Sequence, residues 1–181
     1  AIPYGIHDFC RNEGFVNVGT SRDTAKFAVA SIRTWWQKIG SVKYPDAGSL
    51  LILADCGGSN GYRTRLWKQQ LQAALVDRFD LCIKVCHYPP GASKWNPIEH
   101  RMFSFISNNW AAHPLIDYET VLKFIRATKT FAGLKILAAL HTRKYQKGIR
   151  ICAKQMNKVN LKYYTQRPDW NYSINPMKNV N

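Results

Sequence analysis

Acidic side chains are scarce in this chain of 181 residues, which has 11 Asp and Glu against 26 Lys and Arg. The net charge of +15 indicates an anionic partner, and nucleic acid is the first candidate for a domain of this size. The scarcity is greatest in residues 120–181, which hold 13 basic side chains and one acidic one, against 13 and 10 in residues 1–119. A solvated basic face without a dedicated partner is the alternative, although like charges over such a length repel one another.

Long apolar runs, a signal peptide and paired cysteines are also absent. No apolar run approaches the roughly 20 residues that span a bilayer, and the first residues lack the basic and apolar segments of a secretion signal. The five Cys include no CxxC pair, which argues against a disulfide scaffold, and the 46% hydrophobic content argues against disorder. These absences predict an intracellular, soluble, cytoplasmic protein that has no membrane partner.

Cys82, Cys86 and His87 are close enough in the sequence to suggest a zinc site. They lie in the run LCIKVCH, however, which has the composition of a strand. At about 3.3 Å per residue, two Cys four positions apart on a strand are about 13 Å apart, too far to share one zinc ion. We therefore interpret them as buried small apolar residues.

Apolar periodicity predicts an α/β domain with a mixed sheet, because a short turn joins the first two strands and helices join the later ones. The segment 49–56, SLLILADC, is a continuous apolar run that ends in an Asp, which is typical of a strand buried on both faces. Gly40 is expected to end the first helix, Asn96 and Pro97 to begin the third, and Asp117 to cap the fourth. The expected strands are 4–9, 14–19, 49–56, 81–88 and 133–140, and the expected helices are 25–39, 62–75, 97–110, one after Asp117 and a short one within 153–161.

Two carboxylates stand where such a fold collects ligands. Asp55 ends an apolar strand, and Glu99 lies in the first turn of the helix that follows the next strand. Two converging carboxylates favour Mg²⁺ or Mn²⁺ between them, and such sites hydrolyse and transfer phosphodiesters. Taken singly, Asp55 could cap the following turn, and Glu99 could be a first-turn carboxylate that the helix dipole favours.

Four ordered motifs carry a family resemblance over nearly the whole chain. The stretch CHYPPGASKWNPIEHRMFSFI resembles the third catalytic motif of DDE transposases. Together with GTSRDTAKFAVASIRTWW, YPDAGSLLILADCGGSNGYRTRLWKQQLQ and DWNYSINP, it resembles the ISAzo13 family of insertion-sequence transposases. The resemblance implies an RNase H-like fold, a DDE triad, Mg²⁺ or Mn²⁺ as cofactor, and cleavage and strand transfer of DNA by an enzyme that is a homo-oligomer when intact.

By position, Asp55 matches the second acidic residue of this triad and Glu99 the third. The first acidic residue does not appear, because in the family it lies on an earlier strand, and Asp8 belongs to a later one. The resemblance therefore implies an N-terminally truncated catalytic core, residues 1–115, with a basic α+β extension, residues 116–181, packed on it. We expect this chain alone not to cleave DNA.

Ten residues near these motifs or in the basic region are candidate DNA contacts. For several of them a structural role is about as plausible: Asn96 as a helix cap, Trp95 as a packing residue, and His100, like His87, as a structural rather than proton-carrying side chain. The candidates are Arg63, Arg65, Lys68, Lys94, Trp95, Asn96, His100, Arg143, Lys144 and Lys147.

Two other functions compete with transposition. The turn Gly57–Gly61 satisfies the GxSxG pattern of serine hydrolases around Ser59, and an Asp followed by His141 would complete a triad, but no HGGG-like oxyanion loop is present. The other competitor is a transposase remnant that binds DNA through its basic third and cuts nothing.

Overall fold

Two mixed sheets, one in each of two compact units, contain the strands of this chain, and the expected α/β class is confirmed. The computed structural model describes residues 1–177, with Ser93 as backbone only. Unit 1 comprises Ala1–Arg22 and Ser93–Tyr145, and unit 2 comprises Asp23–Ala92 and Gln146–Asn181. No helix within the described residues is long and apolar enough to cross a membrane.

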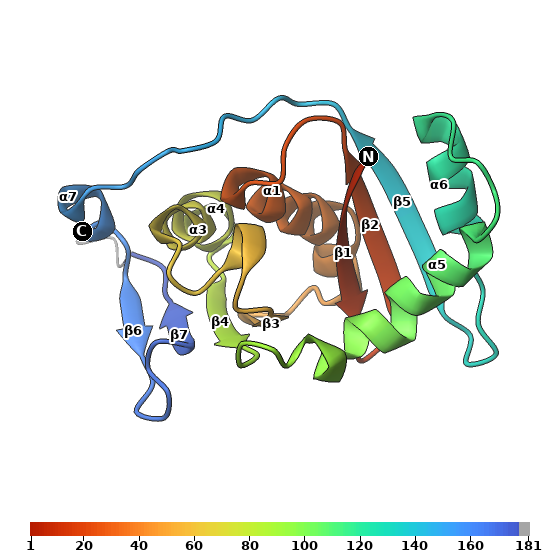
Figure 1. Ribbon diagram of the computed structural model, residues 1–181. Coiled ribbons are helices and arrows are strands. Elements are labelled where there is room, and N and C mark those ends of the chain that lie inside the picture. The colour runs from red at the N-terminus through yellow and green to blue at the C-terminus, as the bar shows by residue number, and fades with distance from the viewer. Residues whose placement is uncertain (178–181) are drawn as a thin grey trace. The chain divides into compact units, whose positions relative to one another are not determined.

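Unit 1 contains a three-stranded sheet of order β1-β2-β5 (Figure 1). The expected hairpin is present, since β1 and β2 are antiparallel, and β5 adds to β2 in parallel. The elements of this unit are β1 (Ile2–Asp8), β2 (Glu13–Gly19), the short η4 (Ser93–Trp95), the continuous helix η5 (Glu99–Phe103) and α5 (Ser104–Trp110), α6 (Tyr118–Ala127) and β5 (Lys135–His141).

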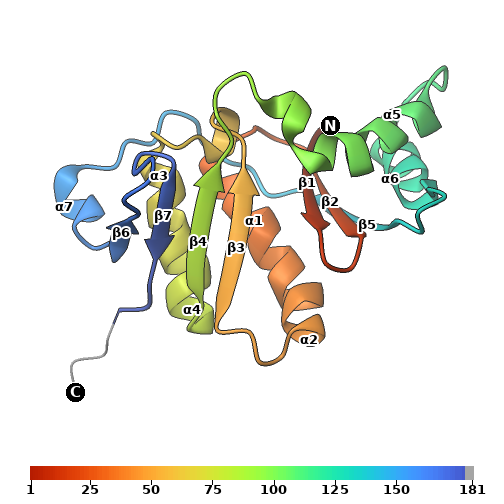
Figure 2. The same ribbon diagram turned by 90° about the horizontal axis from the view of Figure 1, so that it is seen from below.

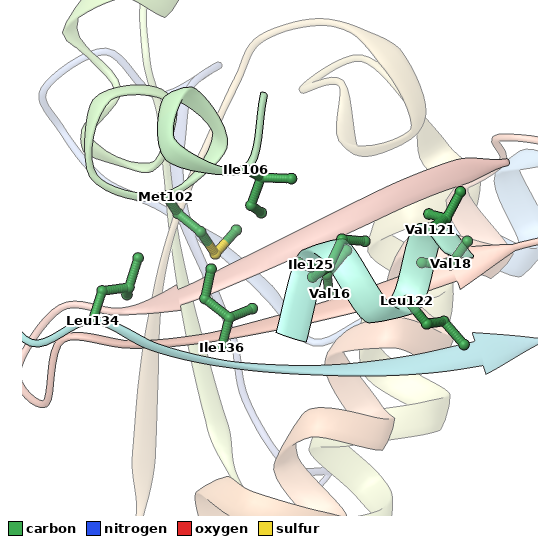
Figure 3. Close-up of a cluster of buried hydrophobic side chains, with 9 residues drawn as sticks. All are labelled: Val16, Val18, Met102, Ile106, Val121, Leu122, Ile125, Leu134 and Ile136. Atoms are coloured by element: carbon green, nitrogen blue, oxygen red, sulfur yellow. The ribbon is translucent and has the colours of Figure 1, made fainter. Parts of the chain in front are cut away.

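The core of unit 1 lies between this sheet and its helices (Figure 3). Met102 and Ile106 come from η5 and α5, and their spacing of four residues places both on one helix face. The remaining members are Val16 and Val18 of β2, Val121, Leu122 and Ile125 of α6, and Leu134 and Ile136 at β5. Phe105, next to Ile106 in the same helix, is exposed.

Unit 2 contains a four-stranded sheet of order β3-β4-β7-β6 (Figure 2). β3 and β4 are parallel, whereas β7 is antiparallel to both β4 and β6. The strands are β3 (Ser49–Ala54), β4 (Cys82–His87), β6 (Leu161–Tyr163) and β7 (Asn171–Ile174). The helices are α1 (Ala25–Trp35) continuing through η1 (Trp36–Gly40) and α2 (Ser41–Lys43), η2 (Gly58–Asn60), α3 (Arg65–Leu71) continuing through η3 (Gln72–Val76) and α4 (Asp77–Phe79), and α7 (Ala153–Met156).

Helices α1, α3 and α4 cover one face of this sheet (Figure 2). The continuous helix α3–η3 contributes three fully buried side chains, Trp67, Leu71 and Leu75. They are four residues apart and therefore lie on one face of the helix. Ile83 and Val85 of β4 are buried as well, two residues apart as alternation on a strand requires. This side of the unit is therefore its apolar core.

Gly40 differs from its expected role as the end of a helix. Its backbone is right-handed helical, with φ −58°, and the helix continues to Lys43. A Cβ at this position would lie 2.5 Å from Cε3 of Trp36, so that glycine is required by the close approach of an indole ring. The start of the same helix is capped by Thr24, whose hydroxyl oxygen accepts a hydrogen bond from the amide of Phe27.

Strand β3 also differs from expectation, because one of its faces is exposed. Leu51 and Leu53 are about half exposed, at 56% and 49%, whereas Ala54 is buried.

Residues 116–181, expected to form one extension, instead supply strands to both sheets, with β5 in unit 1 and β6 and β7 in unit 2.

Candidate catalytic carboxylates and their surroundings

Asp55 directly follows β3, at the carboxyl end of the parallel β3–β4 pair. The ladder pairs Ala54 with His87, and the amide of Tyr88 donates to the carbonyl of Ala54 at 2.8 Å. Because both strands end here, the residues that follow one strand lie beside the last residues of the other. Asp55 is half-buried at this edge.

The ring of His87 contacts the backbone of Asp55. It is 6% exposed, and its Nδ1 lies 2.9 Å from the carbonyl oxygen of Asp55. Burial lowers the pKa of His87, and the charge of Lys68 lowers it further, while the Asp55 carbonyl and carboxylate oppose this. Of the roles that the sequence left open for His87, these observations favour a neutral, structural imidazole over a proton carrier.

The negative charge of Asp55 also affects its sequence and strand neighbours. Burial raises the pKa of the Cys56 thiol and of the Tyr88 phenol, and in both cases the Asp55 carboxylate adds to the effect. Both groups therefore stay protonated at neutral pH.

The glycine-rich segment after Asp55 forms a compact turn around η2. Gly58 has φ +67°, which favours glycine, and the amide of Gly61 donates to the carbonyl of Gly58. Ser59 has no positive φ and lies inside this turn, whereas the next helix begins at Arg65. A nucleophile elbow joins strand and helix directly at the serine, so this geometry favours a turn over a hydrolase site.

Glu99 lies in the first turn of a helix whose start was predicted correctly. The chain is helical from Pro97, and the Asn96 side chain accepts the amide of Ile98 at 3.3 Å. The amide of Glu99 itself donates to the carbonyl of Asn96 at 3.1 Å. These contacts span three residues, so Glu99 is positioned by its own local sequence.

Asp8 was the only other carboxylate considered for the first acidic position of the triad, and its side chain has a structural role. Its Oδ1 accepts the amides of Cys10 and Arg11 in the turn between β1 and β2. This is the bonding of a turn residue. Asp8 therefore gives no reason to assign it the first acidic position.

Asp55 belongs to unit 2 and Glu99 to unit 1, and the structure describes each in its own surroundings. Within the described residues, no group of three or more His, Cys, Asp or Glu is assembled that could hold a metal ion. Cys82 and Cys86 lie on one strand, as expected, and are half-buried. Carboxylate oxygens suit Mg²⁺ or Mn²⁺, so the donor chemistry of Asp55 and Glu99 fits such an ion.

The candidate DNA contacts of the α3 region divide into two kinds. Arg63 is exposed, 5.1 Å from the Tyr62 ring centroid, and Arg65 is exposed and donates to the carbonyl of Ile151. Lys68 differs from the expected outward orientation, because it is 8% exposed and its Nζ lies 4.8 Å from the centroid of the Tyr172 ring. Burial lowers the pKa of Lys68, opposed by the charge of Asp169.

The candidates around Glu99 are mostly exposed. Trp95 is 70% exposed, with the Lys94 ammonium over its ring, and His100 contacts the carbonyl of Lys94 through Nε2. Asn96 is buried as a cap, one of the two roles expected for it. In the extended segment after β5, the three candidates Arg143, Lys144 and Lys147 are all exposed.

The sequence did not identify two residues that contact the surroundings of Asp55. Tyr172 of β7 and Trp67 of α3 are fully buried and bonded to each other, and Tyr172 contacts His87. The alternating pattern of the NYSI segment could have indicated a strand, but nothing in the spacing indicates its partner.

One comparison with known proteins identifies a relative of this chain. A model of the family described as Rhodopirellula transposase DDE domain matches residues 1–176. No curated protein and no solved structure matches the chain significantly. The match spans both units, and the mixed α/β architecture agrees with an RNase H-like DDE domain.

Proposed function

Because the chain belongs to the ISAzo13-type family of transposase DDE domains, we propose that Asp55 and Glu99 are two of the three metal-binding carboxylates of a site that cleaves and transfers DNA strands. The observation that carries the proposal is the family match over residues 1–176, within which both motif carboxylates stand at the ends of ordered elements. Asp55 follows β3, and Glu99 begins the helix capped by Asn96.

The residues of the chain contribute position and charge to this reaction. Asp55 and Glu99 would hold Mg²⁺ or Mn²⁺ through carboxylate oxygens. Such an ion lowers the pKa of bound water and neutralises charge on phosphodiester oxygens. The buried surroundings of Asp55 and the helix cap before Glu99 restrict where each carboxylate can lie, which contributes to the orientation of a bound phosphodiester.

The first acidic position of the DDE triad has no counterpart among residues 1–181. Two carboxylates neutralise a pair of divalent ions incompletely, so this chain by itself is expected to bind metal weakly and not to cleave DNA. In the intact enzyme, a preceding strand would supply this first acidic residue. We propose that the intact enzyme is a homo-oligomer in the bacterial cytoplasm and associated with the nucleoid.

DNA is the proposed partner, and the exposed cations supply the attraction. Neutralised phosphates release counterions, so affinity should fall steeply as salt rises. The proposed contacts are Arg63, Arg65, Lys94, Trp95, His100, Arg143, Lys144 and Lys147, with Asn96 contributing through the loop it caps. Lys68 was a candidate of the same set, but its ammonium is engaged by the aromatic rings of Tyr172 and Tyr163.

Binding of Mn²⁺, followed by electron paramagnetic resonance, tests the metal site directly. We expect weak binding by the natural chain and its loss in both Asp55→Asn and Glu99→Gln. Asp46→Asn is the matched control, because Asp46 is an exposed carboxylate in the loop before β3. Unchanged Mn²⁺ affinity in Asp55→Asn and Glu99→Gln would overturn the assignment, and robust metal-dependent cleavage that Asp55→Asn abolishes would overturn the incompleteness of the chain.

A DNA-binding remnant without catalysis is the second candidate function. The observation that favours it is the missing first acidic residue together with the basic composition of residues 120–181. The genomic sequence upstream distinguishes the two: an in-frame strand that ends in Asp supports the enzyme, and its absence supports the remnant.

A further inference from the structure

A chain of hydrogen bonds in unit 2 leads from the last strand to the backbone of Asp55. Trp67 Nε1 lies 3.0 Å from the Tyr172 hydroxyl, which lies 3.1 Å from His87 Nε2. His87 Nδ1 in turn lies 2.9 Å from the Asp55 carbonyl oxygen. The three side chains come from α3, β7 and β4, and all are buried.

The donors and acceptors of this chain can be assigned from the chemistry of its two ends. The Trp67 indole can only donate, so the Tyr172 oxygen accepts from it. The Asp55 carbonyl can only accept, so His87 carries its proton on Nδ1 and donates there. His87 is buried and the Lys68 ammonium lies over the ring of its partner Tyr172, which favours the neutral imidazole. Its Nε2 then accepts the Tyr172 hydroxyl proton.

The bond to Asp55 lies where the backbone ladder stops. At this end of the β3–β4 pair, the Tyr88 amide donates to the carbonyl of Ala54 at 2.8 Å. The carbonyl of the next residue, Asp55, contacts the side chain of His87. Holding this carbonyl restricts the ψ angle of Asp55 and the start of the glycine-rich turn, and thereby the positions that its carboxylate can reach.

We propose that His87 and Tyr172 are positioning residues for Asp55, so that the DWNYSINP segment, through β7, sets the affinity of the Asp55 site for a divalent cation. The proposal rests on the proposed metal role of Asp55. Neither residue touches the metal; both act through the Asp55 backbone. Removing a partner of this kind commonly weakens metal binding by about 10-fold to 100-fold.

Tyr172→Phe and Tyr163→Phe form a matched pair of variants. Each removes one hydroxyl from a ring that lies near the Lys68 ammonium, and the two rings contact each other at a centroid distance of 6.3 Å. Only the Tyr172 hydroxyl belongs to the chain to Asp55. We expect Mn²⁺ affinity to fall about 10-fold in Tyr172→Phe and to stay unchanged in Tyr163→Phe.

His87→Ala and His87→Asn separate positioning from packing. The amide of Asn can donate from nearly the place of Nδ1, so His87→Asn should recover most of the Mn²⁺ affinity that His87→Ala loses. Both variants remove the ring, so a purely packing role would weaken them alike. Thermal unfolding of each variant verifies that the protein measured is folded.

Nitrogen-15 NMR of the His87 ring gives a readout that does not depend on metal. The proposal requires the Nδ1–H tautomer in the natural chain and in Tyr163→Phe, and a changed Nε2 chemical shift in Tyr172→Phe, where Nε2 loses the hydroxyl proton that it accepts. A dominant Nε2–H tautomer, or equal Mn²⁺ affinity in His87→Ala and the natural chain when Asp55→Asn has lost binding, overturns the positioning role and leaves the proposed function intact. If Asp55→Asn itself binds Mn²⁺ normally, the proposed function fails instead.

Discussion

The two candidate carboxylates are held in contrasting ways. Asp55 depends on residues far away in the sequence, since its carbonyl contacts His87, 32 positions on, and His87 contacts Tyr172, a further 85 positions on. Glu99 depends on the adjacent Asn96 and Pro97, which start its helix. The first setting forms only when unit 2 folds, whereas the second is built into a short segment. Substitutions should therefore affect them through different routes.

Removing the Trp67 side chain should have the largest effect on stability, because Trp67 is at the core end of the hydrogen-bond chain that leads to Asp55. Trp67 is fully buried and donates to Tyr172, so Trp67→Ala should lower the free energy of unfolding by about 3–5 kcal/mol. Urea titration measures this loss. Trp95→Ala is the control: at 70% exposure this ring should change stability by less than about 0.5 kcal/mol. Similar losses from both substitutions would contradict the contrast between buried and exposed indoles.

Removing the Asn96 cap should have a smaller and local effect on the setting of Glu99. Asn96→Ala leaves the amide of Ile98 without its side-chain acceptor and should cost about 1 kcal/mol. Hydrogen exchange should quicken at Ile98, while Asn96→Asp should restore most of the protection. Asn108→Ala, at an exposed position of the same helix, is the matched control. Unchanged exchange at Ile98 in Asn96→Ala would show that the cap does not hold this turn.

The contrast between Lys68 and Arg63 can be sharpened by DNA binding. Arg63 is exposed, so Arg63→Ala should reduce the slope of log affinity against log salt by about 1. Lys68 is held over the rings of Tyr172 and Tyr163, so Lys68→Met should leave the slope unchanged. The measurement is a filter-binding or fluorescence titration of duplex DNA at several salt concentrations. An equal reduction by Lys68→Met would show that its ammonium leaves the rings to bind phosphate.

The smallest expected effect concerns a second local cap in unit 1. Hydrogen bonds from Thr120 hold the pKa of Asp117 below its ordinary value of 3.8. The folded pKa is depressed, so the stabilisation of α6 is fully present above pH 3.8 and is lost as the pH falls through the lower folded value. Circular dichroism during acid titration measures this, and Asp117→Ser, which retains a cap without a titrating group, should remove that pH dependence. Identical acid profiles for the two proteins would contradict the assignment.

The parts of the fold that the sequence predicted well are those set by neighbouring residues. Asn96 with Pro97 and Asp117 begin helices where expected, because a cap and its acceptor amide are two or three residues apart. Strands β1, β2 and β4 lie within two residues of their expected ranges, because composition and apolar patterning within a short run are also local features. Gly40 was wrong as a helix end, because the ring of Trp36, and not a left-handed backbone, is what requires glycine there.

The two carboxylates of the candidate site could be predicted from the sequence, but the distant residues that contact and position Asp55 could not. Asp55 and Glu99 were found from strand ends, helix starts and family motifs, all of which are linear features. His87 was considered as a proton carrier and as a structural residue, and its burial against Tyr172 and the Asp55 carbonyl favours the structural role. Lys68 was expected to face outward because helical spacing alone cannot reveal that β6 and β7 bring two tyrosine rings to that side.

The sequence by itself determined the class of the fold, the two motif carboxylates, the basic composition of the last third and the helix caps, since each depends on composition or on contacts within a few residues. Only the tertiary structure showed which distant segments are partners. It places β5 beside β2 and β7 beside β4, and it links Tyr172 through His87 to the backbone of Asp55 by hydrogen bonds. Strand pairing and burial join residues across many positions, and a single sequence carries no periodicity that records which distant segment will be the neighbour.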